Sequence, residues 1–236
     1  MNTPYIEKMA EQLDQLSLTK INECGGKDIR QLAAYEKDGV RVHLNAYQTE
    51  VAEKIAIGSI AVGNEVNIGV CTIIPKNNIS IPIYVSRWEE RQDTITLLVD
   101  MMPTVDMIVD EAYRVKYLEP LNETWERFSN LSGIQPEDDN DLRSACSIIY
   151  TGACMPIEKE GLRMAALAPH LDYLKKHIAY MADDTPPVNE TKQKEITRRI
   201  AAVRILLGNN LKDLLSKTAE QKLGKEMCDL FRNALT

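Results

Sequence analysis

The spacing of hydrophobic residues changes at Pro103, and this change constrains the fold more than any other feature of the chain. Before it, apolar runs follow one another at short intervals. In one run Val40, Val42 and Leu44 alternate with polar residues, which is typical of a half-buried strand. After it, apolar residues recur at helical spacing, as over 105–131. The chain therefore divides into a strand-rich part followed by a helix-rich part.

This order of elements predicts an α+β fold, with one domain spanning 1–236. We expect about six strands between residues 28 and 102, antiparallel because the connections between them are short. Helices are expected over 4–16 and from 105 to 234, in segments at 105–131, 140–154, 158–181, 190–216 and 219–234. Both faces of such a sheet need cover. The predicted fold class is therefore a single antiparallel β-sheet sandwiched between α-helices, an α/β/α sandwich.

Composition argues against several classes of protein. The chain has 236 residues, 44% hydrophobic and 27% charged, with a net charge of −7, which is typical of a globular protein. No apolar run reaches 18 residues, which argues against a membrane span. The N-terminus does not have a basic segment followed by an apolar one, so we expect no signal peptide. The five cysteines form no CxxC pair, so free thiols in a cytoplasmic protein are a simpler interpretation than a metal centre. Phosphate-binding glycine loops and the HExxH and GxSxG motifs are absent.

Two residue types gave only weak hints of a site. His170 and His177 can share one helix face, but two turns separate them, which is too far for both to bind one metal from that helix. We interpret them as surface or boundary histidines. The many tyrosines can line a pocket for a flat ligand, although we favour their role as core residues with a polar tip.

Basic residues concentrate between positions 191 and 225, where nine of them stand against three acidic ones. One interpretation is a solvated helix face, and the other is a docking surface for an acidic partner. Nucleic acid is disfavoured because the whole chain is acidic and no aromatic residues stand between the basic ones. If the segment docks an acidic protein, Arg198 and Arg199 are the residues that we expect to contact it.

A set of motifs in the strand-rich part resembles the ferredoxin-dependent bilin reductases. That family has a YQT-like strand, a hydrophobic-Pro step, a Pro-hydrophobic-aromatic strand and an acidic residue shortly before a proline. The matching segments are Asn45-Ala46-Tyr47-Gln48-Thr49, Val62-Gly63, Ile73-Ile74-Pro75, Ile81-Pro82-Ile83-Tyr84 and Val99-Asp100-Met101-Met102-Pro103. Weaker similarity extends to Ser144 and Ser147, and to the segment from Gly224 to Phe231.

The resemblance implies a fold, a reaction and a partner. Members of this family place an antiparallel sheet between helices and hold the substrate between the sheet and the C-terminal helices. They carry no flavin or metal, and they pass electrons from ferredoxin to a bound linear tetrapyrrole while side chains supply protons. We therefore expect no bound cofactor, a small hydrophobic conjugated ligand and ferredoxin as the external electron donor. An acidic ferredoxin would also give the basic residues of 191–225 a partner.

The positions that would supply protons depart from the family pattern. By the resemblance, Arg87 takes the place of the family's acid, and the places of its His or Glu fall at Ala56, Gly58 and Val70. None of these four can donate a proton at neutral pH, so the catalytic residues stay unassigned. We expect Arg87 to clamp an anionic group such as a propionate, unless it is an ordinary arginine at a strand end. With Tyr84 these residues form the predicted ligand site, whose sheet-side wall we expect to be wide and apolar.

Three functions stay open on the sequence. The favoured one is ferredoxin-dependent reduction of a linear tetrapyrrole, or of an altered conjugated substrate, by an enzyme with a changed active site. The second is a non-catalytic binding protein for such a ligand. The third is an enzyme that acts on an unrelated substrate in specialised metabolism. A fold by itself does not choose among them.

Overall fold

An antiparallel sheet of nine strands organises the computed structural model, which describes residues 4–131, 133–136, 142, 145–156, 160–183 and 187–236. The strands are β1 (Thr19–Ile21), β4 (Tyr35–Lys37), β5 (Val40–Gln48), β6 (Ala52–Val62), β7 (Val66–Pro75), β8 (Ile83–Arg91), β9 (Thr94–Met102), β10 (Gln135–Pro136) and β11 (Thr151–Pro156). They lie in the order β1-β5-β6-β7-β8-β9-β11-β10, with β4 also beside β5. A separate hairpin is formed by β2 (Glu23–Cys24) and β3 (Lys27–Asp28).

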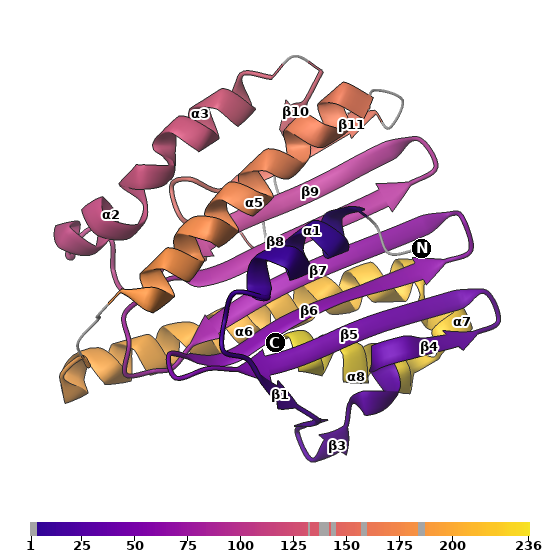
Figure 1. The fold of residues 1–236 in the computed structure, drawn as a ribbon, viewed down its shortest axis with the longest axis horizontal. Coiled ribbons are helices and arrows are strands. Elements are labelled where there is room, and N and C mark those ends of the chain that lie inside the picture. The colour runs from indigo at the N-terminus through magenta and orange to yellow at the C-terminus, as the bar shows by residue number, and fades with distance from the viewer. Residues whose placement is uncertain (1–3, 132, 137–141, 143–144, 157–159, 184–186) are drawn as a thin grey trace.

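Helices cover both faces of this sheet (Figure 1). One face packs against α1 (Pro4–Leu13) and α5 (Glu160–Ala182), and the other against α6 (Glu190–Thr218) and α8 (Lys225–Leu235). The remaining helical elements are η1 (Arg30–Ala34), α2 (Glu111–Tyr117), η2 (Glu119–Leu121), α3 (Asn122–Ser129) and α7 (Glu220–Leu223). The predicted α/β/α sandwich is confirmed. Within the described ranges, no helix is both long and apolar enough to cross a bilayer.

The central strands are buried on both faces, which explains their nearly continuous apolar sequences. In β6, every residue from Ile55 to Val62 is buried. Left-handed backbone at the hairpin turns lets these strands follow one another directly. Asp38 and Gly39, with φ of 52° and 76°, connect β4 to β5, and Gly63, with φ of 55°, connects β6 to β7.

Side chains alternate between the two faces of the sheet, and β8 shows the division. Tyr84, Ser86 and Trp88 contact α5 or α1, whereas Arg87 contacts α6. Paired residues of adjacent strands share a face, so the register extends this division across the sheet. We call the two sides the α1/α5 face and the α6/α8 face.

A buried polar cluster joins α1, β8 and α5 on the α1/α5 face. The Tyr5 hydroxyl contacts Oγ of Ser86 at 2.7 Å, and this Oγ contacts Nδ1 of His170 at 2.5 Å. Nε2 of His177 lies 2.8 Å from the carbonyl oxygen of Pro82. Both histidines are fully buried, so their interpretation as surface or boundary residues is wrong. Burial lowers the pKa of His170 to about 3 and the pKa of His177 to about 4, and both are therefore neutral at pH 7.

Sequence reasoning missed strands at both ends of the sheet. β1 precedes the expected boundary at residue 28, and β10 and β11 follow the one at 102. The helix predicted over 140–154 is wrong over 145–154: residues 145–150 form turns and irregular backbone, and the residues from 151 onward form β11 and pair with β9. This pairing joins segments far apart in the sequence and overrides the local helical spacing. The helix predicted over 219–234 is divided into α7 and α8 at Gly224, whose φ is 83°.

Candidate functional site

Four of the five predicted ligand residues lie together on the α6/α8 face. Gly58 pairs with Val70, and Val70 pairs with Arg87, so these three form one row across β6, β7 and β8. Ala56 lies two residues before Gly58, and it packs in the same buried apolar cluster as Val70. The two-residue spacing along β6 and the register between strands therefore bring these residues to one surface.

Tyr84, the fifth predicted residue, lies on the α1/α5 face. Its hydroxyl donates to the carbonyl oxygen of His170 at 3.0 Å, and its ring centroid lies 5.9 Å from that of His177. Burial raises the pKa of this hydroxyl well above its usual value. The structure thus separates Tyr84 from Arg87 by the thickness of the sheet. Alternation along the strand indicates this already, because the two positions differ by an odd number.

Phe231 of α8 covers the row. A Cβ atom on Gly58 would lie 3.1 Å from Cε2 of Phe231 and 2.9 Å from the carbonyl oxygen of His43. Glycine therefore leaves just enough room for the ring, which is fully buried. The surface that these residues form is apolar, and the room that its small residues leave is filled by this ring.

Three side chains fasten the last turn of α8 to the strands beneath it. Sγ of Cys24 and Nζ of Lys54 donate to the carbonyl oxygen of Asn233 at 3.1 and 3.2 Å. Oγ1 of Thr72 donates to the carbonyl oxygen of Leu235 at 2.6 Å. Carbonyl groups in the last turn of a helix lack partners within the helix, so these bonds satisfy them and hold α8 against the sheet in this arrangement.

Arg87 lies at the end of the row, beneath α6. Its Nη1 donates to Oδ1 of Asn210 on α6 at 2.5 Å, and only 9% of the residue is exposed. Glu89, two residues further along β8, pairs with Arg91 at 2.5 Å. A buried guanidinium can hold a carboxylate through two parallel hydrogen bonds, so this end of the row suits an anionic group.

Asp100 on β9 is a candidate that sequence reasoning left without a role. It pairs with Val85 while Arg87 pairs with Leu98, so Asp100 and Arg87 are diagonal neighbours on the α6/α8 face. Asp100 is fully buried, and Ser147 donates to it from its backbone N–H at 2.8 Å and from its hydroxyl. Burial raises the pKa of Asp100 to about 6, although the Ser147 bonds oppose this. The sequence signal was one acid in an otherwise uncharged strand.

Ser144, which shares the weaker similarity with Ser147, lies outside the described residues. Ser147 belongs to the segment that precedes β11, and its two bonds join that segment to β9. The segments that carry the resemblance thus include both Asp100 and Ser147, but the sequence does not indicate that the two residues are in contact.

Arg198 and Arg199 lie in the first half of α6, away from the row on the sheet. With Lys194 they line a cavity of about 530 Å³ that Asp106 and Glu195 also border. The backbone N–H of Asp106 donates to Oε1 of Glu195 at 3.0 Å, which ties the segment after β9 to this helix. The two predicted docking residues therefore share one surface, and it is distinct from the α6/α8 face.

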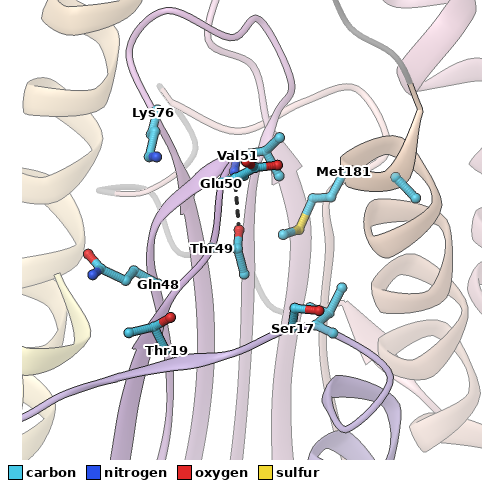
Figure 2. A pocket seen from close by; sticks show the side chains of 10 residues that line it. Ser17, Thr19, Gln48, Thr49, Glu50, Val51, Lys76 and Met181 are labelled. Carbon is cyan, nitrogen blue, oxygen red and sulfur yellow. Dashed lines mark hydrogen bonds between the residues drawn. The ribbon is translucent and has the colours of Figure 1, made fainter.

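A further cavity, of about 650 Å³, opens at the end of the sheet (Figure 2). Gln48 and Thr49 line it at the end of β5, together with Lys76 after β7 and Met181 near the end of α5. Oγ1 of Thr49 accepts the backbone N–H of Ala52 at 2.9 Å, which holds the turn between β5 and β6. None of the predicted ligand residues lines this cavity, although Gln48 and Thr49 belong to the motifs that carry the resemblance.

This architecture is that of the ferredoxin-dependent bilin reductases, and the resemblance found in the sequence is confirmed at the level of fold. Phytochromobilin synthase from tomato, solved in complex with biliverdin, is 14% identical and has a TM-score of 0.73, over 97% of this chain and 81% of that chain. PcyX is 13% identical and has a TM-score of 0.53, over 95% of this chain and 93% of that chain. No protein-family model matches the sequence, and no curated protein matches it.

Proposed function

We propose that this protein binds a linear tetrapyrrole, or a related anionic conjugated molecule, on the α6/α8 face. It reduces this ligand with electrons from ferredoxin and carries no flavin or metal of its own. The observation that supports the proposal most is the row of Gly58, Val70 and Arg87. It offers a flat, apolar surface with a buried cation at one end, in a fold shared with a protein solved in complex with biliverdin.

In this proposal, ligand binding requires α8 to move away from the sheet. Phe231 fills the space beside Gly58, so a flat ligand on this surface must displace the ring. Gly224 at the start of α8 has a φ of 83°, a conformation that glycine adopts at little cost, and it can serve as the joint. The closed and open arrangements are then two states of one protein, and the ligand selects the open state.

A titration with biliverdin, followed by visible absorption with and without reduced ferredoxin, tests the proposal. Binding should shift the absorption band, and reduction should bleach it or produce a stable new band. Arg87→Ala should weaken binding by about 1.5–3 kcal/mol, roughly 10- to 150-fold in Kd, because a hydrogen bond to a charged group is lost. Arg91→Ala is the matched control, since this arginine lies on the same strand with its side chain 47% exposed. If Arg87→Ala binds biliverdin as tightly as the parent, Arg87 is not at the site.

A non-catalytic binding protein for the same ligand is the second candidate. It is favoured by one observation: Ala56, Gly58 and Val70, the positions where the resemblance places proton donors, carry no ionisable group. In the titration, a shifted band that reduced ferredoxin leaves unchanged would identify this candidate. An unshifted band would point instead to an unrelated substrate.

Ferredoxin docking is assigned in this proposal to basic residues in the first half of α6. Lys194, Arg198 and Arg199 border the cavity there, and their positive charge complements an acidic protein. Ile108 is 94% exposed and lies two residues after Asp106, which borders the same cavity. An exposed apolar residue beside a basic patch suits a protein partner that combines steering by charge with a small apolar contact.

Charge reversal tests the docking surface. Arg198→Glu combined with Arg199→Glu should slow association with ferredoxin and weaken its dependence on salt, because steering by opposite charge is lost. The matched control is Lys212→Glu combined with Lys217→Glu, an equal change of charge further along the same helix. Similar effects of the two double variants would mean that overall charge, and not this surface, governs association.

A further inference from the structure

Two carboxyl groups of β8 and β9 lie on the α6/α8 face, Glu89 and Asp100, and their surroundings differ. Glu89 pairs with a cation, Arg91, at 2.5 Å. The described groups that donate to Asp100, from Ser147, Cys146 and the backbone of Met101, are neutral. A fully buried carboxyl group whose described partners are all neutral favours its protonated form, and burial accordingly raises the pKa of Asp100 to about 6. With this raised pKa, a fraction of Asp100 is protonated near neutral pH.

The position of Asp100 relative to Arg87 suits a ligand that spans both. They are diagonal neighbours on adjacent strands, and such pairs have Cα atoms about 7–8 Å apart. Val85 and Leu98, their direct partners, provide apolar surface on the same face. An anionic group held by Arg87 therefore lies one strand away from Asp100.

We propose that Asp100 is the proton donor of the proposed reduction. It acts from β9, the strand next to the one that carries Arg87. The inference rests on the proposed function. In each one-electron step reduced ferredoxin is oxidised and the ligand gains its electron. The O–H bond of the Asp100 carboxyl group breaks, and a C–H or N–H bond forms on the ligand.

The carboxylate left behind is stabilised by the backbone N–H of Ser147, a bond that does not depend on the serine side chain, and charge-assisted bonds of this kind are stronger than neutral ones. It takes a proton from water before the second step. Two such steps deliver two electrons and two protons, which completes the reduction of one double bond.

A purely structural role for Asp100, as the anchor of the segment before β11, makes a different prediction from proton donation. Asp100→Asn keeps an oxygen that can accept the backbone N–H of Ser147 but has no carboxyl proton. Ser147→Ala removes the anchoring hydroxyl and leaves the acid in place. Proton donation requires the first variant to fail and the second to work, whereas anchoring requires both to be impaired.

The experiment is a single-turnover reduction of bound biliverdin by reduced ferredoxin, with biliverdin Kd and Tm measured for each variant. Asp100→Asn should bind biliverdin as the parent does and lose at least about 100-fold in the rate of reduction. Ser147→Ala should keep most of the rate, and Asp100→Glu should recover part of it. Glu89→Gln, the other carboxyl group of this face, should reduce biliverdin as the parent does.

Reduction by Asp100→Asn at the parent rate overturns the inference, as does an equal loss in Ser147→Ala. If Asp100→Asn does not fold, Ser147→Ala decides, because loss of turnover with the acid intact also overturns it. A parent protein that binds biliverdin without reducing it removes this inference and leaves the binding part of the proposed function standing. A parent protein that does not bind biliverdin removes both.

Discussion

Truncation of Phe231 tests whether α8 both stabilises the protein and covers the ligand surface. The ring is fully buried, and it lies so close to Gly58 that a Cβ atom there would be 3.1 Å from it. A buried aromatic side chain removes roughly 150–250 Å² from water, which at about 25 cal/mol per Å² is at most about 4–6 kcal/mol. Core Phe→Ala changes cost about 3–5 kcal/mol. We therefore expect Phe231→Ala to lower the free energy of unfolding by that amount and Tm by roughly 6–20 °C.

The assay is urea unfolding at equilibrium, beside a biliverdin titration of the folded variant. The chain offers a matched control, because its second phenylalanine, Phe128 on α3, is also buried and lies away from the α6/α8 face. Phe128→Ala should cost a similar amount of stability and leave biliverdin affinity unchanged. Phe231→Ala should bind biliverdin more tightly than the parent, because the ligand no longer has to displace the ring.

Two results would refute this reasoning. A loss below about 1 kcal/mol in Phe231→Ala would show that the ring is not packed in the core, since surface substitutions stay near ±0.5 kcal/mol. An equal change of biliverdin affinity in the Phe231 and Phe128 variants would show that loosening the whole protein, and not clearing the space beside Gly58, affects the ligand.

Two further predictions concern stability. Gly69→Ala should lower the free energy of unfolding by about 1–3 kcal/mol, because the added Cβ would lie 2.6 Å from Cδ1 of Tyr5. Urea unfolding measures this loss, and an unchanged free energy of unfolding would show that α1 shifts freely. Acid should also destabilise the protein: the pKa values of His170 and His177 lie near 3 and 4 in the folded state, below the usual value near 6.5. The stability that the neutral histidines provide above pH 6.5 is therefore lost as pH falls toward 4, by up to about 2 kcal/mol per histidine at pH 5. The raised pKa of Asp100 acts in the opposite direction and offsets only part of this loss. Urea unfolding at pH 7 and pH 5 measures the change, and equal stability at the two values would contradict it.

Much of the fold follows from local patterns in the sequence. The alternation of Val40, Val42 and Leu44, the long apolar runs and the helical spacing after Pro103 predicted one antiparallel sheet between helices. They succeed because alternation and helical spacing are properties of a few consecutive residues. The same alternation places Gly58 on the face of Ala56 and separates Tyr84 from Arg87, so part of the candidate site was also readable before the structure.

The tertiary structure decided what lies against each face. β11 is a strand because β9 offers it hydrogen bonds, although its own spacing favoured a helix. His170 is buried and neutral because α5 lies on the sheet, and Asp100 has a raised pKa because it is fully buried in the folded protein. The contact between Phe231 and Gly58 also depends on the tertiary structure, because the two residues come from distant parts of the chain. Burial depends on segments far apart in the sequence that meet only in the folded protein, so no local pattern carries it.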